Sequence, residues 1–169
     1  MKRIMNLIIV LSLFAQVCNG QKIETMEEYK VFFDSITSCL KIAEKDSSCY
    51  IGKPFPEFVK HLDKCGLKII RVAIGNNYDW QKVSPQHLYG IIVFFTNSQQ
   101  DDFVWTYDLW QPRIIIMFDE SMPYVQALRL VRKYKGSFEG EDEKFYSETV
   151  IKSLFFLIPD EIYKFPPKK

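Results

Sequence analysis

The chain has 169 residues, of which 47% are hydrophobic, and this fits one folded domain on the usual scale of about 100–200 residues per domain. Such an apolar content is enough for a packed core and excludes a chain that is disordered over most of its length. The formal net charge of +1 at pH 7 provides no basic surplus for phosphates, so we expect no nucleic-acid partner.

Residues 1–20 have the pattern of a secretory signal peptide, MKRIMNLIIVLSLFAQVCNG. Lys2 and Arg3 give a positive start, and an apolar run from Ile4 to Ala15 follows. This run is shorter than the roughly 20 apolar residues that a membrane-spanning helix needs. We therefore expect export, and a mature chain that contains no transmembrane segment.

Cleavage is expected before Gln21, which makes the protein secreted or periplasmic. The removed segment holds two basic residues and no acidic one, so the net charge changes from +1 to −1. An alternative is a bacterial lipoprotein that is lipid-modified at Cys18. The lipoprotein motif prefers a leucine at Ala15 and a small residue at Val17, so simple secretion is the favoured interpretation.

The first predicted helix covers residues 25–46, TMEEYKVFFDSITSCLKIAEKD. Its apolar residues recur at intervals of three and four, which places them on one helical face. Thr25 and Glu28 match the capping-box pattern, in which each side chain accepts a hydrogen bond from the other's backbone amide. The expected core face consists of Tyr29, Phe32, Phe33, Ile36, Leu40 and Ala43.

A second helix is predicted within YIGKPFPEFVKHL, residues 50–62, and the residues that follow. Gly52 and Pro54 favour a tight turn into the helix, and Pro56 suits the first helical position because proline lacks an amide hydrogen. Gly66 is placed for a left-handed helix cap. Every unusual residue of this stretch therefore has a structural explanation, and we interpret the stretch as architecture and not as a site.

Three short segments rich in β-branched and aromatic residues then predict strands at 67–74, 88–95 and 112–118. The connection between the last two contains a possible extra strand, FVWTY, at 103–107. A helix follows, with Ser121 as its expected cap and Gly136 after its last turn. A short acidic helix and a final strand, VIKSLFFLI, complete the series.

Strands that run together and do not alternate with helices predict an α+β domain. We expect two N-terminal helices, a mainly antiparallel sheet of about four strands, and two further helices before the last strand. The segments IIIMF and FFLI are apolar on both faces, so both are expected to be central strands. The predicted division is a signal peptide at 1–20, one domain at 21–158 and a C-terminal tail at 159–169.

Few residues are suited to catalysis. The best nucleophile pair is His61 with Cys65, four residues apart on one helix, although His61 is expected to be exposed beside Lys60 and Lys64. The acidic residues cluster at helix starts and in loops, where caps and solubility explain them. No phosphate-binding glycine pattern is present. We expect no enzyme activity, no metal and no cofactor.

The mature chain has three cysteines, at positions 39, 49 and 65, and an exported protein can form disulfides. Their spacing does not match a zinc ligand set, which contains close pairs. We expect one disulfide that joins Cys39 to Cys49 or to Cys65.

Aromatic residues crowd the two long connections between the strands. Rigid amphipathic rings of this kind are frequent in binding hot spots and also stack on sugar rings. The other interpretation is that these connections close the core, and both stay open at this stage. Trp110 leads into a strand and is expected to pack, whereas Trp105 is expected to be exposed. The candidate binding residues are Tyr78, Trp80, Phe103, Trp105 and Tyr107.

The segments NGQK, IGKPFPEFVKHL, WQPRIIIMF and YKG carry a resemblance across most of the mature chain. In these the chain resembles small, uncharacterised secreted proteins of Bacteroides-type bacteria. Residues 50–75 are also similar to the helix-strand units of beta-lactamase-inhibitor-protein and SmpA/OmlA-like folds. That likeness implies non-enzymatic protein binding, although the second matching unit of the inhibitor is missing.

The sequence therefore favours a secreted or periplasmic, non-catalytic binding protein whose partner is a protein or a glycan. A structural or envelope-assembly subunit, with its aromatics buried against partner chains, is the alternative. A hydrolase with an unrecognised site ranks below both.

Overall fold

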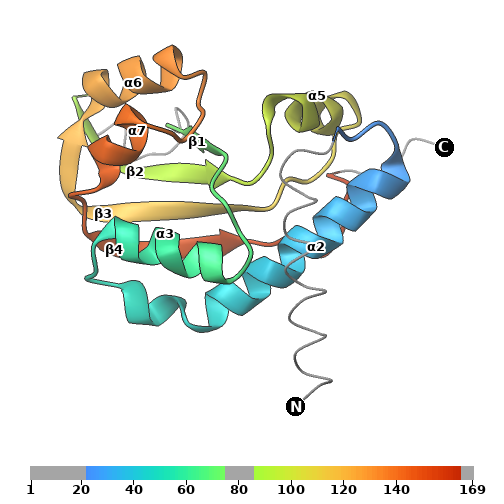
Figure 1. Cartoon of the computed structure of the whole chain (residues 1–169), viewed down its shortest axis with the longest axis horizontal. Coiled ribbons are helices and arrows are strands. Elements are labelled where there is room, and N and C mark those ends of the chain that lie inside the picture. Colours follow the sequence, from blue (N-terminus) through green and yellow to red (C-terminus); the bar gives the residue numbers. More distant parts are fainter. Residues whose placement is uncertain (1–21, 75–85, 165–169) are drawn as a thin grey trace.

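The computed structural model describes residues 22–74 and 86–164 (Figure 1). The predicted signal peptide and two of the candidate binding residues, Tyr78 and Trp80, lie outside these ranges. The elements in chain order are α2 (Met26–Lys45), the 3-10 helix η1 (Ser47–Tyr50), α3 (Phe55–Lys64), β1 (Arg71–Ala73), β2 (His87–Phe94), α5 (Ser98–Thr106), β3 (Arg113–Pro123), α6 (Tyr124–Lys133), α7 (Glu141–Tyr146) and β4 (Ile151–Leu157).

The four strands form one antiparallel sheet in the order β1-β2-β3-β4, so each strand pairs with its neighbour in the sequence. Two helices precede the sheet, and α6 and α7 precede its last strand. The predicted α+β fold, with its N-terminal helices and two later helices, is confirmed.

The core lies between one face of the sheet and the helices. Alternate residues of β3, namely Ile114, Ile116 and Phe118, are almost fully buried, while the residues between them are half-buried on the opposite face. The Phe55 ring of α3 lies 5.9 Å from the Phe118 ring, and the Tyr146 ring of α7 lies 6.3 Å from it. Figure 1 shows α3 lying across β4, and α2 running diagonally past the end of β4.

The predicted caps at the start of α2 and the end of α3 are present in the structure. Thr25 and Glu28 form the expected capping box at the start of α2. Gly66 has φ 81°, and the Leu67 amide behind it donates to the Leu62 carbonyl at 2.8 Å, which closes α3 with a left-handed cap.

One segment that the sequence predicts as a possible strand is a helix in the structure. Residues 103–107, expected as an extra strand, belong to α5 and its C-terminal end. The reason lies upstream, where the side chains of Asn97 and Gln100 form a capping box that starts the helix. The helical period then separates aromatic residues that a strand would have placed on one side.

Three further expectations need correction. β3 continues to Pro123, so Ser121 is not a helix cap, and α6 starts at Tyr124. The first strand is limited to Arg71–Ala73. β4 was expected to be central, but it is an edge strand, and the outer side chains Phe155 and Leu157 stay exposed.

Candidate functional site

The exposed aromatic residues of α5 are the first part of the candidate site. The Trp105 side chain is 68% exposed and Tyr107 is 52% exposed, whereas the preceding helical positions Phe103 and Val104 are buried. The Phe103 ring lies 5.9 Å from the Tyr29 ring of α2 and 4.6 Å from the Tyr107 ring. α5 therefore packs one side against the core and presents Trp105 on the other.

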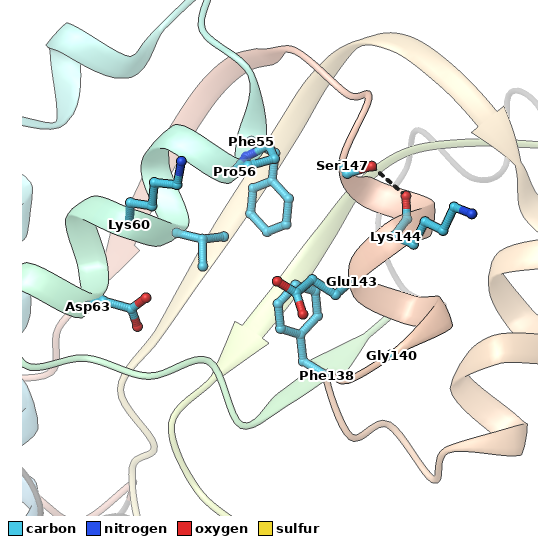
Figure 2. A pocket seen from close by; sticks show the side chains of 10 residues that line it. Phe55, Pro56, Lys60, Asp63, Phe138, Gly140, Glu143, Lys144 and Ser147 are labelled. Atoms are coloured by element: carbon cyan, nitrogen blue, oxygen red, sulfur yellow. Dashed lines mark hydrogen bonds between the residues drawn. The ribbon is translucent and has the colours of Figure 1, made fainter.

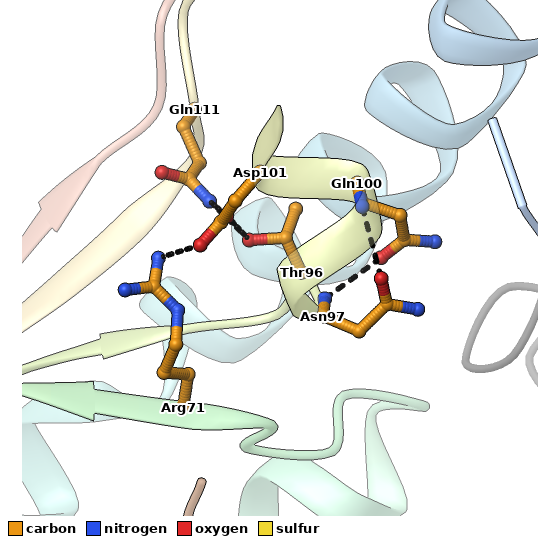
Figure 3. Close-up of polar contacts among 6 residues, drawn as sticks. All are labelled: Arg71, Thr96, Asn97, Gln100, Asp101 and Gln111. Carbon is orange, nitrogen blue, oxygen red and sulfur yellow. Dashed lines mark hydrogen bonds and ion pairs between the residues drawn. The ribbon is translucent and has the colours of Figure 1, made fainter. Parts of the chain in front are cut away.

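A buried polar network holds α5 against the sheet (Figure 3). Asp101, which is only 8% exposed, accepts hydrogen bonds from Thr96 and Gln111 at 2.6 Å each and forms an ion pair with Arg71. Gln111 also donates to the Thr96 hydroxyl. The network joins α5 to β1, to the segment after β2 and to the segment before β3, so three other parts of the chain fix the orientation of the helix.

Two more contacts stabilise the ends of this network. The Arg71 guanidinium lies 4.4 Å above the Phe94 ring, which completes its packing on the sheet. The Tyr29 hydroxyl of α2 donates to the Trp110 carbonyl, and burial together with the nearby Asp101 charge raises the pKa of Tyr29 above its ordinary range. Tyr29 therefore keeps its proton and remains a hydrogen-bond donor at any physiological pH.

The C-terminal segment forms the second part of the site. The Trp110 amide donates to the Ile162 carbonyl at 2.7 Å, which places the following residues beside the end of α5. The Lys164 ammonium then lies 4.4 Å from the centre of the Trp105 ring and 3.6 Å from the Asp108 carboxylate. We call Trp105, Tyr107, Asp108 and Lys164 the α5 aromatic surface.

This surface has the composition of a recognition site. Its aromatic rings offer a large apolar area with few rotatable bonds, and such rings lose little entropy on binding. Asp108 and Lys164 offer one charge of each sign beside them. The arrangement is suited to contact with another surface.

The five predicted binding residues are only partly brought together. Trp105 and Tyr107 share the exposed surface, whereas Phe103 belongs to the core. Trp110 is half-buried and packs against the core, as expected, and Trp105 is exposed, as expected. Lys164 and Asp108 were missed, because their contact with Trp105 depends on chain segments that are distant in the sequence.

The expected exposure of His61 is wrong. Its side chain is only 8% exposed, and its ring stacks on the Tyr50 ring with centroids 4.6 Å apart. The sequence placed His61 beside two lysines, but η1 folds Tyr50 over this side of α3 and covers it. The His61 Nε2 atom lies 3.3 Å from the Ala43 carbonyl oxygen, which can only accept a hydrogen bond.

His61 and Cys65 share one side of α3, with Sγ 3.8 Å from Nε2. The hydrogen that Nε2 donates to the Ala43 carbonyl occupies the position where a base would accept the thiol proton. Burial, with a smaller contribution from the Asp46 charge, raises the pKa of the Cys65 thiol. A protonated thiol is a poor nucleophile, so the geometry does not support this pair as a catalytic one.

The predicted disulfide is absent from the structure. Cys39 and Cys65 are half-buried and Cys49 is exposed, and no two of the three lie at disulfide distance. Within the described ranges, no group of three or more histidine, cysteine and acidic residues is arranged to hold a metal ion.

Comparison of the chain with protein-family models, with curated proteins and with solved structures found no match. The function proposed below is therefore argued from the residues of this chain alone.

Proposed function

We propose that the chain is an exported, non-catalytic binding protein that contacts its partner through the α5 aromatic surface. The observation that carries the proposal is the 68% exposure of Trp105 on a helix whose orientation is fixed by a buried network. Tryptophan is enriched among the residues that dominate binding energy in protein interfaces. Preorganisation by Asp101 reduces the entropy that binding would cost.

The partner we favour is a protein. The Asp108–Lys164 pair borders the aromatic rings, and a polar rim around an aromatic centre is the usual composition of a protein interface. One face of the Trp105 ring is in contact with the Lys164 ammonium, which leaves the other face for the partner. A glycan that stacks on that free face is the second partner class, and the experiment below includes it.

The proposal is tested with three purified proteins, namely the wild type, Trp105→Ala and Val31→Ala. Val31 lies on α2, is 61% exposed and serves as the matched control for loss of an exposed apolar side chain. We expect urea denaturation to find both variants within about 0.5 kcal/mol of the wild type, as for ordinary surface changes. Each protein is then immobilised and exposed to envelope extract and, separately, to a glycan array.

We expect Trp105→Ala to lose a partner that the wild type and Val31→Ala both retain. A partner protein lost from the extract, or a glycan lost from the array, identifies the class. Equal retention by all three proteins contradicts the proposal. A loss of about 3 kcal/mol or more of stability in Trp105→Ala also contradicts it, because such a loss is typical of a buried aromatic side chain.

Export is the second part of the proposal. Cleavage before Gln21 would place the described domain outside the cytoplasm, and no helix of the described residues is long and apolar enough to cross a membrane. Intact-mass measurement of exported material should find a chain that starts at Gln21. A diacylglyceryl group on Cys18 would replace secretion with lipid anchoring and leave the binding proposal untouched.

A structural or envelope-assembly subunit is the second candidate, and one observation favours it. Phe155 and Leu157 of the edge strand β4 are 53% and 36% exposed, and edge strands with apolar side chains are sites of pairing between chains. Sedimentation analysis distinguishes the candidates. A subunit would self-associate and Phe155→Ser would reduce the association, whereas a monomer at high concentration excludes assembly through β4.

A further inference from the structure

A groove of about 580 Å³ lies between α3 and α7, on the part of the fold that carries Phe55 and Phe138 (Figure 2). Its volume is in the range of small-molecule sites, which hold about 300–1,000 Å³. The floor is apolar and aromatic, with Val59 and Pro56 beside the two phenylalanine rings. The groove is distinct from the α5 aromatic surface and shares no residue with it.

The aromatic floor is rigid. The Phe55 and Phe138 rings meet edge to face with centroids 6.0 Å apart, and the buried Tyr146 ring lies 6.4 Å and 6.5 Å from them. The Phe138 amide donates to the Ile70 carbonyl at 3.0 Å, which ties this residue to the chain leading into β1. The floor therefore exists before any ligand enters.

Carboxylates stand on both walls of the groove. Figure 2 shows the Asp63 carboxylate on the α3 wall and the Glu143 carboxylate extending from α7 toward α3. Neither is in an ion pair with another described residue. Two lysines also line the groove, but Figure 2 shows the Lys144 ammonium pointing away from α3 and the Lys60 ammonium pointing away from Phe138.

A third carboxylate, that of Asp142, belongs to α7. Asp142 is fully buried, and neither of its carboxylate oxygens has a hydrogen-bond partner among the described residues. The Tyr146 hydroxyl, also buried, has no partner either. Burial raises the pKa of Asp142 to about 6, so it is largely ionised at neutral pH. Its charge adds to the negative potential of the groove, because a low-dielectric interior screens it weakly.

We propose that the groove between α3 and α7 binds a small organic cation, an alkylammonium group on an apolar body. Aromatic rings attract cations through the negative potential of their faces, and rings combined with carboxylates are the usual means of recognising quaternary ammonium groups. The ammonium group lies between Asp63 and Glu143 over the floor. The apolar body contacts Val59 and Pro56.

The probes are choline, its uncharged isostere in which a carbon replaces the nitrogen, and tert-butylacetate, an anion of similar size. Each is titrated into the full chain, and the methyl resonances of Val59 and the ring resonances of Phe138 report binding in the groove. We expect choline to bind and the isostere to bind about tenfold more weakly. This difference in affinity is the size expected for a desolvated cation–π contact. No binding of the anion is expected.

Four variants test the assignment. Glu143→Gln and Asp63→Asn remove one charge each without changing shape, and each should weaken choline about threefold or more and leave the isostere unaffected. Phe138→Leu keeps an apolar side chain but removes the ring, and it should also weaken choline binding selectively. Glu57→Gln, an exposed charge on α3 outside the groove, is the matched control and should change nothing.

Several results would overturn the proposal. Equal binding of choline and its isostere would make the groove a merely apolar site. Unchanged choline affinity in both Glu143→Gln and Asp63→Asn would exclude recognition by the wall carboxylates. Choline-induced shifts confined to Trp105 and Tyr107 would place the cation on the α5 aromatic surface instead, and the absence of any shift would exclude the site. Circular dichroism of each variant shows whether the fold is retained.

Discussion

Replacement of Asp142 by asparagine should stabilise the protein at neutral pH. This carboxylate is fully buried, its oxygens have no hydrogen-bond partner among the described residues, and burial raises its pKa to about 6. An unperturbed aspartate has a pKa of about 3.9, and each unit of difference corresponds to about 1.36 kcal/mol. The ionised carboxylate therefore lowers the free energy of unfolding at pH 7 by about 3 kcal/mol relative to an exposed one.

Asparagine has the same shape and no charge, so Asp142→Asn removes most of this cost. The carboxylate lies in the first turn of α7, and the loss of its favourable interaction with the helix dipole offsets about 0.3–1 kcal/mol. We expect a net gain of about 2 kcal/mol at pH 7. Urea denaturation at a series of pH values from about 4 to 8 measures it, with Glu143→Gln, an exposed carboxylate on the same helix, as the control.

The pH dependence has a definite sign. The folded-state pKa is higher than the unfolded one, so the folded protein binds more protons between about pH 4 and pH 6. Wild-type stability should fall as the pH rises through this window, and Asp142→Asn should lack this fall. Parallel pH profiles for the two proteins, or a destabilised Asp142→Asn variant at pH 7, would refute the conclusion that Asp142 is an isolated buried carboxylate.

Three further predictions concern the sheet and α5. On β4, Phe156→Ala should cost about 3 kcal/mol in urea denaturation because this ring packs against the core. Phe155→Ala, at an exposed position, should change stability by less than about 0.5 kcal/mol. Equal losses in the two variants would mean that the outer face of β4 is covered. Asp101→Ala leaves the Arg71 guanidinium without its ion pair and should cost about 3–5 kcal/mol by thermal denaturation, so a loss below about 1 kcal/mol would make the network dispensable. Gly90→Ala places a Cβ atom against the Ile116 carbonyl oxygen of β3 and should lower stability by about 1–3 kcal/mol, and an unchanged melting curve would contradict this close approach of the two strands.

The local order of helices and strands follows from residue patterns that act over a few positions. The capping pair Thr25 and Glu28, and the glycine at position 66, mark the ends of α2 and α3 in the sequence as they do in the structure. Apolar residues at intervals of three and four, or at alternate positions, place a core face on each element. These signals are local, so the α+β class could be predicted without tertiary contacts. At α5 the aromatic run favours a strand, but the N-terminal cap at Asn97 starts a helix there.

Exposure, in contrast, was decided by the tertiary structure. His61 stands beside lysines in the sequence and Trp105 stands in an aromatic run, yet His61 is covered by Tyr50 and Trp105 is left in solvent. β4 carries apolar residues on both faces, and only the strand order shows that it forms an edge. The residue pattern of one segment indicates which side chains favour burial. Which of them are buried depends on the other segments that pack against it.

The candidate sites depend on such distant contacts. Lys164 reaches Trp105 because the C-terminal segment pairs with the residues that follow α5, and the groove forms because α3 and α7, far apart in the sequence, share the Phe55 and Phe138 floor. In the sequence Asp142 resembles its acidic neighbours Glu141 and Glu143. The packing of α7 buries Asp142 and leaves these two neighbours exposed. The sequence by itself determines the elements and their buried faces. Only tertiary packing determines which aromatic rings and carboxylates remain without a partner, because that depends on which segments meet in space.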